Sequence, residues 1–407
     1  MRAYERFLKY VTIDTQSDAN SNASPTTEKQ KDLGRLLVQE LHELGITNAF
    51  LDDFGYVYAC VKGNYEAKPF ALLAHMDTSP DLTGKDVKPQ IIYNYDGKDI
   101  KLNDEYTLRI KEFPEMVKYT GKDLIVTDGT TLLGADNKAG VAEIMAMVEE
   151  LVSHPEIEHG DVYVVFTPDE EVGKGTDNFN FEYCPCEFGY TCDGGAVGTI
   201  DFENFNAAST TVTFTGVSIH PGTSKNKMIN AAEVALEYHR LLPEQAKPEY
   251  TDGCDGFYHL HDMVGCVEEA KLEYILRNHD RELFERQKEM MEICASFINK
   301  KYNRDIVKVH TVDSYYNMKE KFDGKMYIVE MVEEALRNLG YDPKRTAIRG
   351  GTDGANLTYM GMCCPNLGVG GGNFHGRYEF ASIQDMEEAV KVLLEIVKRV
   401  RERGKHE

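Results

Sequence analysis

Hydrophobic positions recur at helical spacing in several parts of the chain. In the segment 27–45 the leucines predict a helix with one apolar face, and Gly45 follows as a helix stop (Leu33, Leu37, Leu41 and Leu44). A second, longer helix is predicted from about residue 138 to 152. Short runs rich in β-branched and aromatic residues at 56–61, 70–74 and 162–166 predict buried strands. This alternation favours an α/β sheet with helices on both faces.

The order of elements changes near residue 207 and changes back after about residue 319. Between these points we read a strand at 209–217, a helix at 228–241, two strands within 257–277, a helix at 281–299 and a strand at 305–312. The order β-α-β-β-α-β is the ferredoxin-like arrangement, which forms a small α+β domain of its own. We therefore expect a discontinuous main domain of residues 1–207 and 319–407, interrupted by an inserted domain of residues 208–318. The main domain resumes with a helix near 326–339, a strand near 366–369 and a C-terminal helix from about 383.

Composition excludes several classes of protein. Acidic residues number 68 against 45 basic ones, and the formal charge of −23 opposes binding to nucleic acid or to an anionic membrane. The first residues lack the apolar core of a signal peptide, and no run of about 18 apolar residues occurs, so we expect a cytoplasmic protein. The nine cysteines are odd in number and scattered, which indicates reduced thiols.

Candidate metal ligands follow the predicted strands. His75 and Asp77 come directly after the strand 70–74, at the end where open α/β sheets place their ligands. Taken alone, a histidine at a strand end is more often a hydrogen-bonded structural residue. Asp136 stands just before the long helix, and taken alone it would be interpreted as a helix N-cap.

Two adjacent acids follow the strand 162–166. Glu170 and Glu171 belong to the run Thr-Pro-Asp-Glu-Glu, and in such a pair one carboxylate can bind metal while its neighbour moves protons. Asp193 follows another short run, and a further histidine lies in a glycine-rich segment near the C-terminus. The candidate ligands are His75, Asp136, Glu171, Asp193 and His375. This mixed nitrogen and oxygen set, without thiolates, is suited to zinc.

Seven short motifs together carry a resemblance that runs from the first helix to the last. They are HMDTSP, GADNKAG, TPDEEVGKG, CDGG, SIHPG, RGGTDGA and GGGNFHG. With these motifs the chain resembles the peptidase T branch of the co-catalytic zinc aminopeptidases. The resemblance implies a mixed-sheet zinc exopeptidase domain with the inserted ferredoxin-like domain as its lid. It also implies two Zn²⁺ ions per subunit.

The resemblance assigns a role to each candidate in the main domain. Asp136 would bridge the two zinc ions, His75 and Asp193 would complete one metal, and Glu171 and His375 the other. Asp77 would orient His75, and Glu170 would be the general base to the bridging water. Three carboxylate ligands would neutralise most of two dications, and the remaining positive charge would acidify the shared water.

Four further residues are candidates for substrate binding. His220 could donate to the developing oxyanion, although its other interpretation is an exposed turn histidine. The resemblance implies that Asn226, Arg277 and Arg349 hold the backbone and termini of the peptide, and an arginine fork suits a carboxylate. In relatives the lid histidine sometimes comes from a partner subunit, which leaves a homodimer open.

The implied activity is that of a tripeptide aminopeptidase, which removes the N-terminal residue from short peptides. An amidohydrolase or deacylase, or a dipeptidase, could use the same two-metal site and remains an alternative. A catalytically silent binding protein is disfavoured because Glu170 is present. His259 and His261 share one face of a predicted strand, and we interpret that face as solvated.

Overall fold

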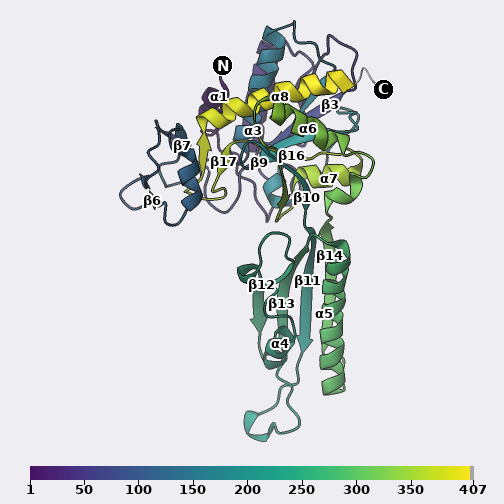
Figure 1. Cartoon of the computed structure of the whole chain (residues 1–407). Coiled ribbons are helices and arrows are strands. Elements are labelled where there is room, and N and C mark those ends of the chain that lie inside the picture. Colours follow the sequence, from purple (N-terminus) through teal and green to yellow (C-terminus); the bar gives the residue numbers. More distant parts are fainter. Residues whose placement is uncertain (404–407) are drawn as a thin grey trace. The chain divides into compact units, whose positions relative to one another are not determined.

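The computed structural model describes residues 1–403, and the chain forms two compact units (Figure 1). The main unit comprises Met1–Phe202, Lys321–Thr346 and the chain from Thr352 onward. The inserted unit comprises Glu203–Glu320 together with Ala347–Gly351. The interpretation of the sequence placed 347–351 in the main domain, whereas the structure groups this short segment with the insertion.

An eight-stranded mixed sheet forms the centre of the main unit. Its strand order is β1-β2-β8-β3-β9-β16-β10-β15. The bounds are β1 Phe50–Leu51, β2 Val57–Val61, β3 Phe70–His75, β8 Val162–Thr167, β9 Gly189–Gly194, β10 Thr199–Asn204, β15 Lys344–Ile348 and β16 Asn366–Gly368. The central strands β8, β3, β9 and β16 run parallel, while β2 and β10 pair antiparallel with their neighbours. The predicted α/β fold with a mixed sheet is confirmed.

Helices and loops cover both faces of this sheet. Every residue of β3 is buried, which requires cover on each side. Helix α3 (Ala135–Ser153) contacts β3 and β9 and is itself covered by α1 (Ala3–Tyr10) and α8 (Ile383–Arg403), so it is apolar on nearly all sides. The remaining helices of this unit are α2 (Gln30–Glu43), α6 (Tyr327–Asn338) and α7 (Asp353–Met360).

A second, four-stranded sheet was not predicted. Its order is β17-β18-β7-β4, and it pairs a segment before α3 with the segment that carries the glycine-rich motif. The bounds are β4 Gln90–Ile92, β7 Leu124–Val126, β17 Gly371–Gly372 and β18 Phe380–Ser382. A hairpin of β5 (Ile100–Lys101) and β6 (Thr107–Leu108) and a 3₁₀ helix, η1 (Pro114–Tyr119), accompany it. Strands of two or three residues are too short for a periodic signal, which explains the omission.

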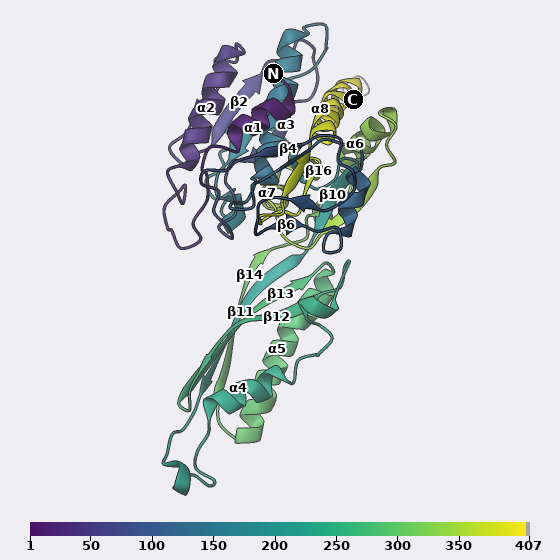
Figure 2. The ribbon, with the colours of Figure 1, turned by 90° about the vertical axis from the view of Figure 1, so that its left-hand side faces the viewer.

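The inserted unit is the predicted ferredoxin-like domain. Its four strands form an antiparallel sheet of order β12-β13-β11-β14, and the chain order is β11, α4, β12, β13, α5, β14 (Figure 2). The bounds are β11 Asn206–Thr215, α4 Ala231–His239, β12 Phe257–Gly265, β13 Glu269–Asn278, α5 Arg281–Tyr302 and β14 Val307–Tyr315. Residues alternate between buried and partly exposed along β13, because the helices cover one face only.

Two expectations from composition concern the whole chain. All nine cysteines are free thiols, as predicted. Within residues 1–403, no helix combines the length and the apolar character needed to span a membrane.

Candidate active site

Three neighbouring parallel strands bring the first candidate ligands together. His75 is the last residue of β3, Glu170 and Glu171 follow β8 after a tight turn, and Asp193 lies near the end of β9. Because β8, β3 and β9 are adjacent and parallel, their carboxyl ends meet at one edge of the sheet.

His75 has separate partners for its two ring nitrogens. Nδ1 lies 3.0 Å from the backbone carbonyl oxygen of Asp77 and 3.3 Å from its carboxylate. Two acceptors on this side favour the proton on Nδ1, which orients the ring. Nε2 faces the opposite way, 2.8 Å from Oδ1 of Asp136 and 3.3 Å from Oδ1 of Asp193. A neutral imidazole held like this presents the Nε2 lone pair to the cluster.

The two carboxylate oxygens of Asp136 face two different histidines. Oδ1 is the atom near His75, whereas Oδ2 lies 3.4 Å from Nε2 of His375. His375 Nε2 is also 2.9 Å from Oε2 of Glu171, and its Nδ1 is 3.1 Å from the carboxylate of Asp81. His75, Asp136 and Glu171 each offer an atom within 4.8 Å of the others. The cluster thus has two halves that share Asp136.

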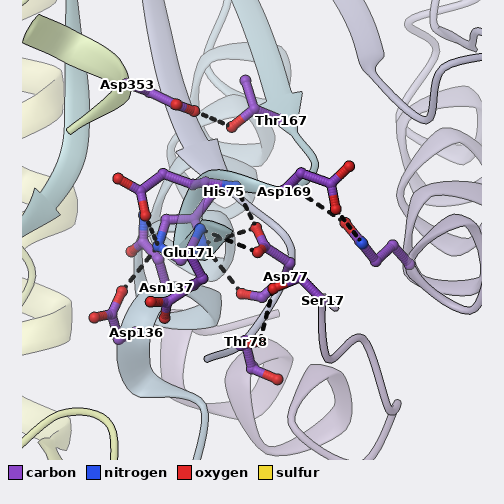
Figure 3. Close-up of polar contacts among 12 residues, drawn as sticks. Ser17, His75, Asp77, Thr78, Asp136, Asn137, Thr167, Asp169, Glu171 and Asp353 are labelled. Atoms are coloured by element: carbon purple, nitrogen blue, oxygen red, sulfur yellow. Dashed lines mark hydrogen bonds and ion pairs between the residues drawn. The ribbon is translucent and has the colours of Figure 1, made fainter. Parts of the chain in front are cut away.

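The turn that carries the two glutamates is held by buried acids. The carboxylate of Asp77, which is fully buried, accepts the backbone N–H groups of Glu170 at 3.0 Å and of Glu171 at 3.2 Å (Figure 3). Asp169 adopts a left-handed φ of 58°, and its carboxylate accepts hydrogen bonds from the side chains of Thr26 and Gln30. Glu170 then places Oε2 4.0 Å from Nε2 of His75.

Burial and charge give these groups unusual acidities. Burial raises the pKa of Glu171 to about 7, and repulsion from Asp136 adds to it, against a hydrogen bond from His375 that lowers it. Burial likewise raises the pKa of Glu170 well above its ordinary value, with repulsion from Asp193 contributing. Hydrogen bonds to Asp136 and then Glu171 raise the pKa of His375 to about 11. The carboxylates lie close together in low-dielectric surroundings, and a bound cation would offset the repulsion between them.

The residues present fit divalent metal ions. Oε1 of Glu171 is buried and has no hydrogen-bond partner among the described residues. The donor set of two imidazoles and three carboxylates is the kind that zinc accepts. Asp136 does not cap the helix: its carboxylate is directed to the two histidines, and the neighbouring Asn137 accepts the backbone N–H of Gly140 at 3.3 Å.

Two predicted residues of the inserted unit lie at one end of its sheet. Arg277 is the register partner of Phe257, and the guanidinium of Arg349 lies 5.6 Å from the ring of Phe257. Arg349 donates to the carbonyl oxygens of Gly253 at 2.8 Å and Asp255 at 3.2 Å, so much of its fork is already engaged. The Arg277 guanidinium lies 5.3 Å from the ring of Tyr315.

The other two predicted residues lie at the opposite end of that sheet. Arg277 pairs with Ala207 at the start of β11, whereas His220 and Asn226 follow the last residue of that strand. Ten residues of β11 span about 30 Å. Both side chains are exposed, and His220 Nδ1 accepts the backbone N–H of Gly222 at 3.1 Å. Within the inserted unit, these two residues are not brought together with the arginines.

Two residues of the site were missed from the sequence. Asp353 is buried and accepts the hydroxyl of Thr167 at 2.7 Å, directly before the glutamate turn (Figure 3). Glu379 is buried and accepts three backbone N–H groups around Asp136. Asp353 stands in the RGGTDGA motif, and Glu379 is four residues after His375. Proximity to a motif was therefore the available signal for both.

One known protein family matches a large part of this chain. The model of peptidase family M20/M25/M40 matches residues 127–399. The chain belongs to peptidase family M20/M25/M40. As a member of M20/M25/M40 it is an enzyme, a hydrolase of the metallopeptidase class.

Related proteins match this chain over nearly its full length. A peptidase T of Caldanaerobacter subterraneus subsp. tengcongensis is 51% identical, covering 99% of this chain and 100% of its own. A peptidase T of Clostridium acetobutylicum is 50% identical and covers 97% of each chain.

Solved structures show the same fold at lower identity. An aminopeptidase of Bacillus cereus superposes with a TM-score of 0.78 at 21% identity, and a tripeptidase of Staphylococcus aureus with 0.78 at 23% identity, each covering 98% of both chains. A dinuclear metal-binding peptidase of the M20 family from Bacillus subtilis gives 0.68 at 14% identity, covering 98% of this chain and 97% of that one.

Proposed function

We propose that this M20/M25/M40 enzyme is a tripeptide aminopeptidase with two zinc ions per subunit. The observation that carries the proposal is the direction of the Asp136 carboxylate, whose two oxygens face different imidazoles. His75 and Asp193 would hold one ion, Glu171 and His375 the other, and Asp136 both. Relatives about 50% identical over nearly the full chain are named peptidase T, which supports the substrate class.

The metal ions would supply a Lewis acid for the scissile carbonyl and acidify the attacking water. Glu170 is then the side chain that moves the proton. It belongs to the same turn as the ligand Glu171 yet lies toward His75, 4.0 Å from Nε2. Asp77 holds the turn by its backbone and not by the Glu170 carboxylate, so that carboxylate stays available to take a proton and return it to the leaving amine.

We assign the selectivity for short peptides to residues that bind the two ends of the substrate. The acidic cluster would bind the protonated α-amine, and the guanidinium group of an arginine would pair with the terminal carboxylate. Arg277 is the stronger candidate for this pairing, since its guanidinium donates to the Leu276 carbonyl oxygen at 2.9 Å, whereas Arg349 makes three hydrogen bonds to the 251–255 loop. Arg349 would instead fix that loop beside Arg277.

If Arg277 binds the substrate, a role for His220 requires a second copy of the chain. A tripeptide spans only about 10 Å, whereas His220 and Arg277 stand at opposite ends of a strand about 30 Å long. One inserted unit therefore cannot present both residues to the same tripeptide. If Arg277 binds the substrate carboxylate, then His220 acts on a substrate held by a partner, and the enzyme is a homodimer.

Metal analysis and a peptide panel on one preparation test the proposal. We expect close to two zinc ions per chain, loss of hydrolysis on chelation, and recovery with zinc or cobalt. Free tripeptides should be cut after their first residue. Full activity with a single ion per chain would contradict the two-metal site, and preferential release of acetate from N-acetyl amino acids would favour the deacylase alternative.

A further inference from the structure

Glu379 is a buried acid whose carboxylate contacts the main chain around Asp136. Its side chain is 1% exposed. Oε2 accepts the backbone N–H groups of Leu133 and Gly134, each at 2.8 Å, and Oε1 accepts the backbone N–H of Asp136 at 2.9 Å. One carboxylate therefore holds three donors within four consecutive residues.

These N–H groups need an acceptor from elsewhere in the chain. Leu133 and Gly134 precede α3, and Asp136 has non-helical dihedral angles, with φ −85° and ψ 102°. The regular part of the helix is capped by Asn137, whose Oδ1 accepts the backbone N–H of Gly140 at 3.3 Å. The N–H groups of the irregular segment before that cap have no helical partner, and Glu379 accepts all three of them from a distant segment.

The same short segment also carries His375. Glu379 lies four residues after His375, between that histidine and strand β18, and its backbone N–H donates to Gly376 at 3.3 Å. His375 and Asp136 face one another across 3.4 Å between Nε2 and Oδ2. The Glu379 carboxylate is thus a fixed link between the backbones that carry two of the candidate ligands.

The arrangement has a counterpart on the other side of the cluster. There the Asp77 carboxylate accepts two backbone N–H groups of the glutamate turn. In both places an acid that faces away from the candidate metal positions holds the main chain of a ligand. Fixing the backbone leaves the ligand carboxylate itself free.

We propose that Glu379 is a positioning residue that sets the place of Asp136 relative to His375, and so the geometry between the two metal ions. The inference rests on the proposed two-metal site. It does not depend on which peptide is hydrolysed.

Glu379→Gln is the first test, because an amide keeps the volume but turns one acceptor into a donor. The amide has one acceptor oxygen to offer to the three N–H groups, so at least one of these groups is left without an acceptor. Glu379→Asp is the second variant: it keeps the charge but retracts the carboxylate from the loop. Glu143→Gln is the matched control, since Glu143 is also 1% exposed and lies further along α3.

Each protein is loaded with Co²⁺, and the visible absorption spectrum, the metal affinity by chelator competition, the melting temperature, kcat and KM are measured. For both Glu379 variants we expect an altered cobalt spectrum and a 10- to 100-fold loss in metal affinity or kcat, with KM less affected. Glu143→Gln should keep the wild-type spectrum and affinity.

A wild-type spectrum and affinity in Glu379→Gln would overturn the inference, whether or not the melting temperature falls. Equal spectral changes in Glu143→Gln would overturn it as well, since any buried acid of α3 would then have the same effect. Absence of metal binding by the wild-type chain would overturn both this inference and the proposed function, and it is recorded before the variants are compared.

Discussion

The backbone N–H of Glu170 donates to the carboxylate of Asp77 at 3.0 Å. The main-chain carbonyl oxygen of the same aspartate accepts a hydrogen bond from Nδ1 of His75. Asp77 therefore ties the end of β3 to the turn after β8. This contact also separates the two glutamates in function, since it fixes their backbones while their carboxylates point to different partners.

The first prediction concerns these adjacent glutamates. Glu170→Ala should keep two metal ions and the wild-type melting temperature, while kcat falls on the order of a hundredfold or more, because only proton transfer is lost. Glu171→Ala should instead lose metal, since Glu171 lies 2.9 Å from the other candidate ligand His375. Metal content and kcat, measured on both purified variants, distinguish these defects. Identical defects in the two variants would contradict the assignment.

A second prediction concerns the contact between α3 and β9. An alanine at Gly140 would place its Cβ 2.0 Å from the carbonyl oxygen of Cys192. Glycine to alanine inside a helix normally stabilises by about 1 kcal/mol, but overpacking against backbone costs about 1–3 kcal/mol and should prevail here. We expect Gly140→Ala to lower the free energy of unfolding in chemical denaturation. It should also weaken metal binding, because Cys192 precedes Asp193.

Gly195→Ala is the control for this substitution. Gly195 is also close to Asp193 in the chain, but its Cβ would meet nothing within 4 Å. It should unfold and bind metal like the wild type. If Gly140→Ala were as stable as this control, the packing of α3 on β9 would not require glycine at position 140.

The sequence predicted elements whose pattern extends over many residues. The long apolar α3, the buried strands β3 and β8, and the whole β-α-β-β-α-β insertion were all recognisable, because burial on one or two faces imposes a regular period. The sheet of β4, β7, β17 and β18 was not, since each strand has only two or three residues and the pairing of β7 with β18 joins segments more than 200 residues apart.

The same distinction holds for the site. Candidate ligands such as His75 and Glu171 follow strands and carry a chemistry that can be recognised in the sequence. Glu379 and Asp353 act through hydrogen bonds to distant segments, Leu133–Asp136 and Thr167, and no local pattern marks an acid for such a task. The position of His220 at the far end of the inserted sheet also depends on strand register, which one sequence does not reveal.

A third prediction tests whether His220 acts between subunits. His220→Ala alone should raise the barrier by about 2.7–4 kcal/mol if the imidazole donates to the oxyanion, with KM less affected. Mixing this inactive variant with inactive Glu170→Ala should restore activity, because half of the randomly formed dimers contain one complete site. About a quarter of the wild-type activity is expected at equal amounts.

The control for this mixture is Glu170→Ala combined with Glu171→Ala. These two residues lie on one turn of the main unit, so no hybrid dimer restores a complete site from them. Failure of the first mixture, with confirmed subunit exchange, would exclude a shared site. Wild-type turnover in His220→Ala alone would return His220 to the interpretation of an exposed turn residue.

The last prediction concerns how the enzyme measures peptide length. If Arg277 pairs with the substrate carboxylate, amidating the C-terminus of a tripeptide should lower kcat/KM more than changing its side chains does, because a buried charge without its partner costs several kcal/mol. Arg277→Ala should remove this penalty by lowering activity on the free tripeptide toward that on the amide. Arg277→Glu should lower kcat/KM for the free tripeptide further than Arg277→Ala does, since repulsion of the carboxylate replaces attraction. Arg281→Ala is the matched control, because Arg281 lies over Tyr316 at the start of α5 and is not assigned to substrate. Equal hydrolysis of tripeptides and decapeptides by the wild type would contradict the length measurement, and an unchanged preference for the free carboxylate in Arg277→Ala would move that role to another cation.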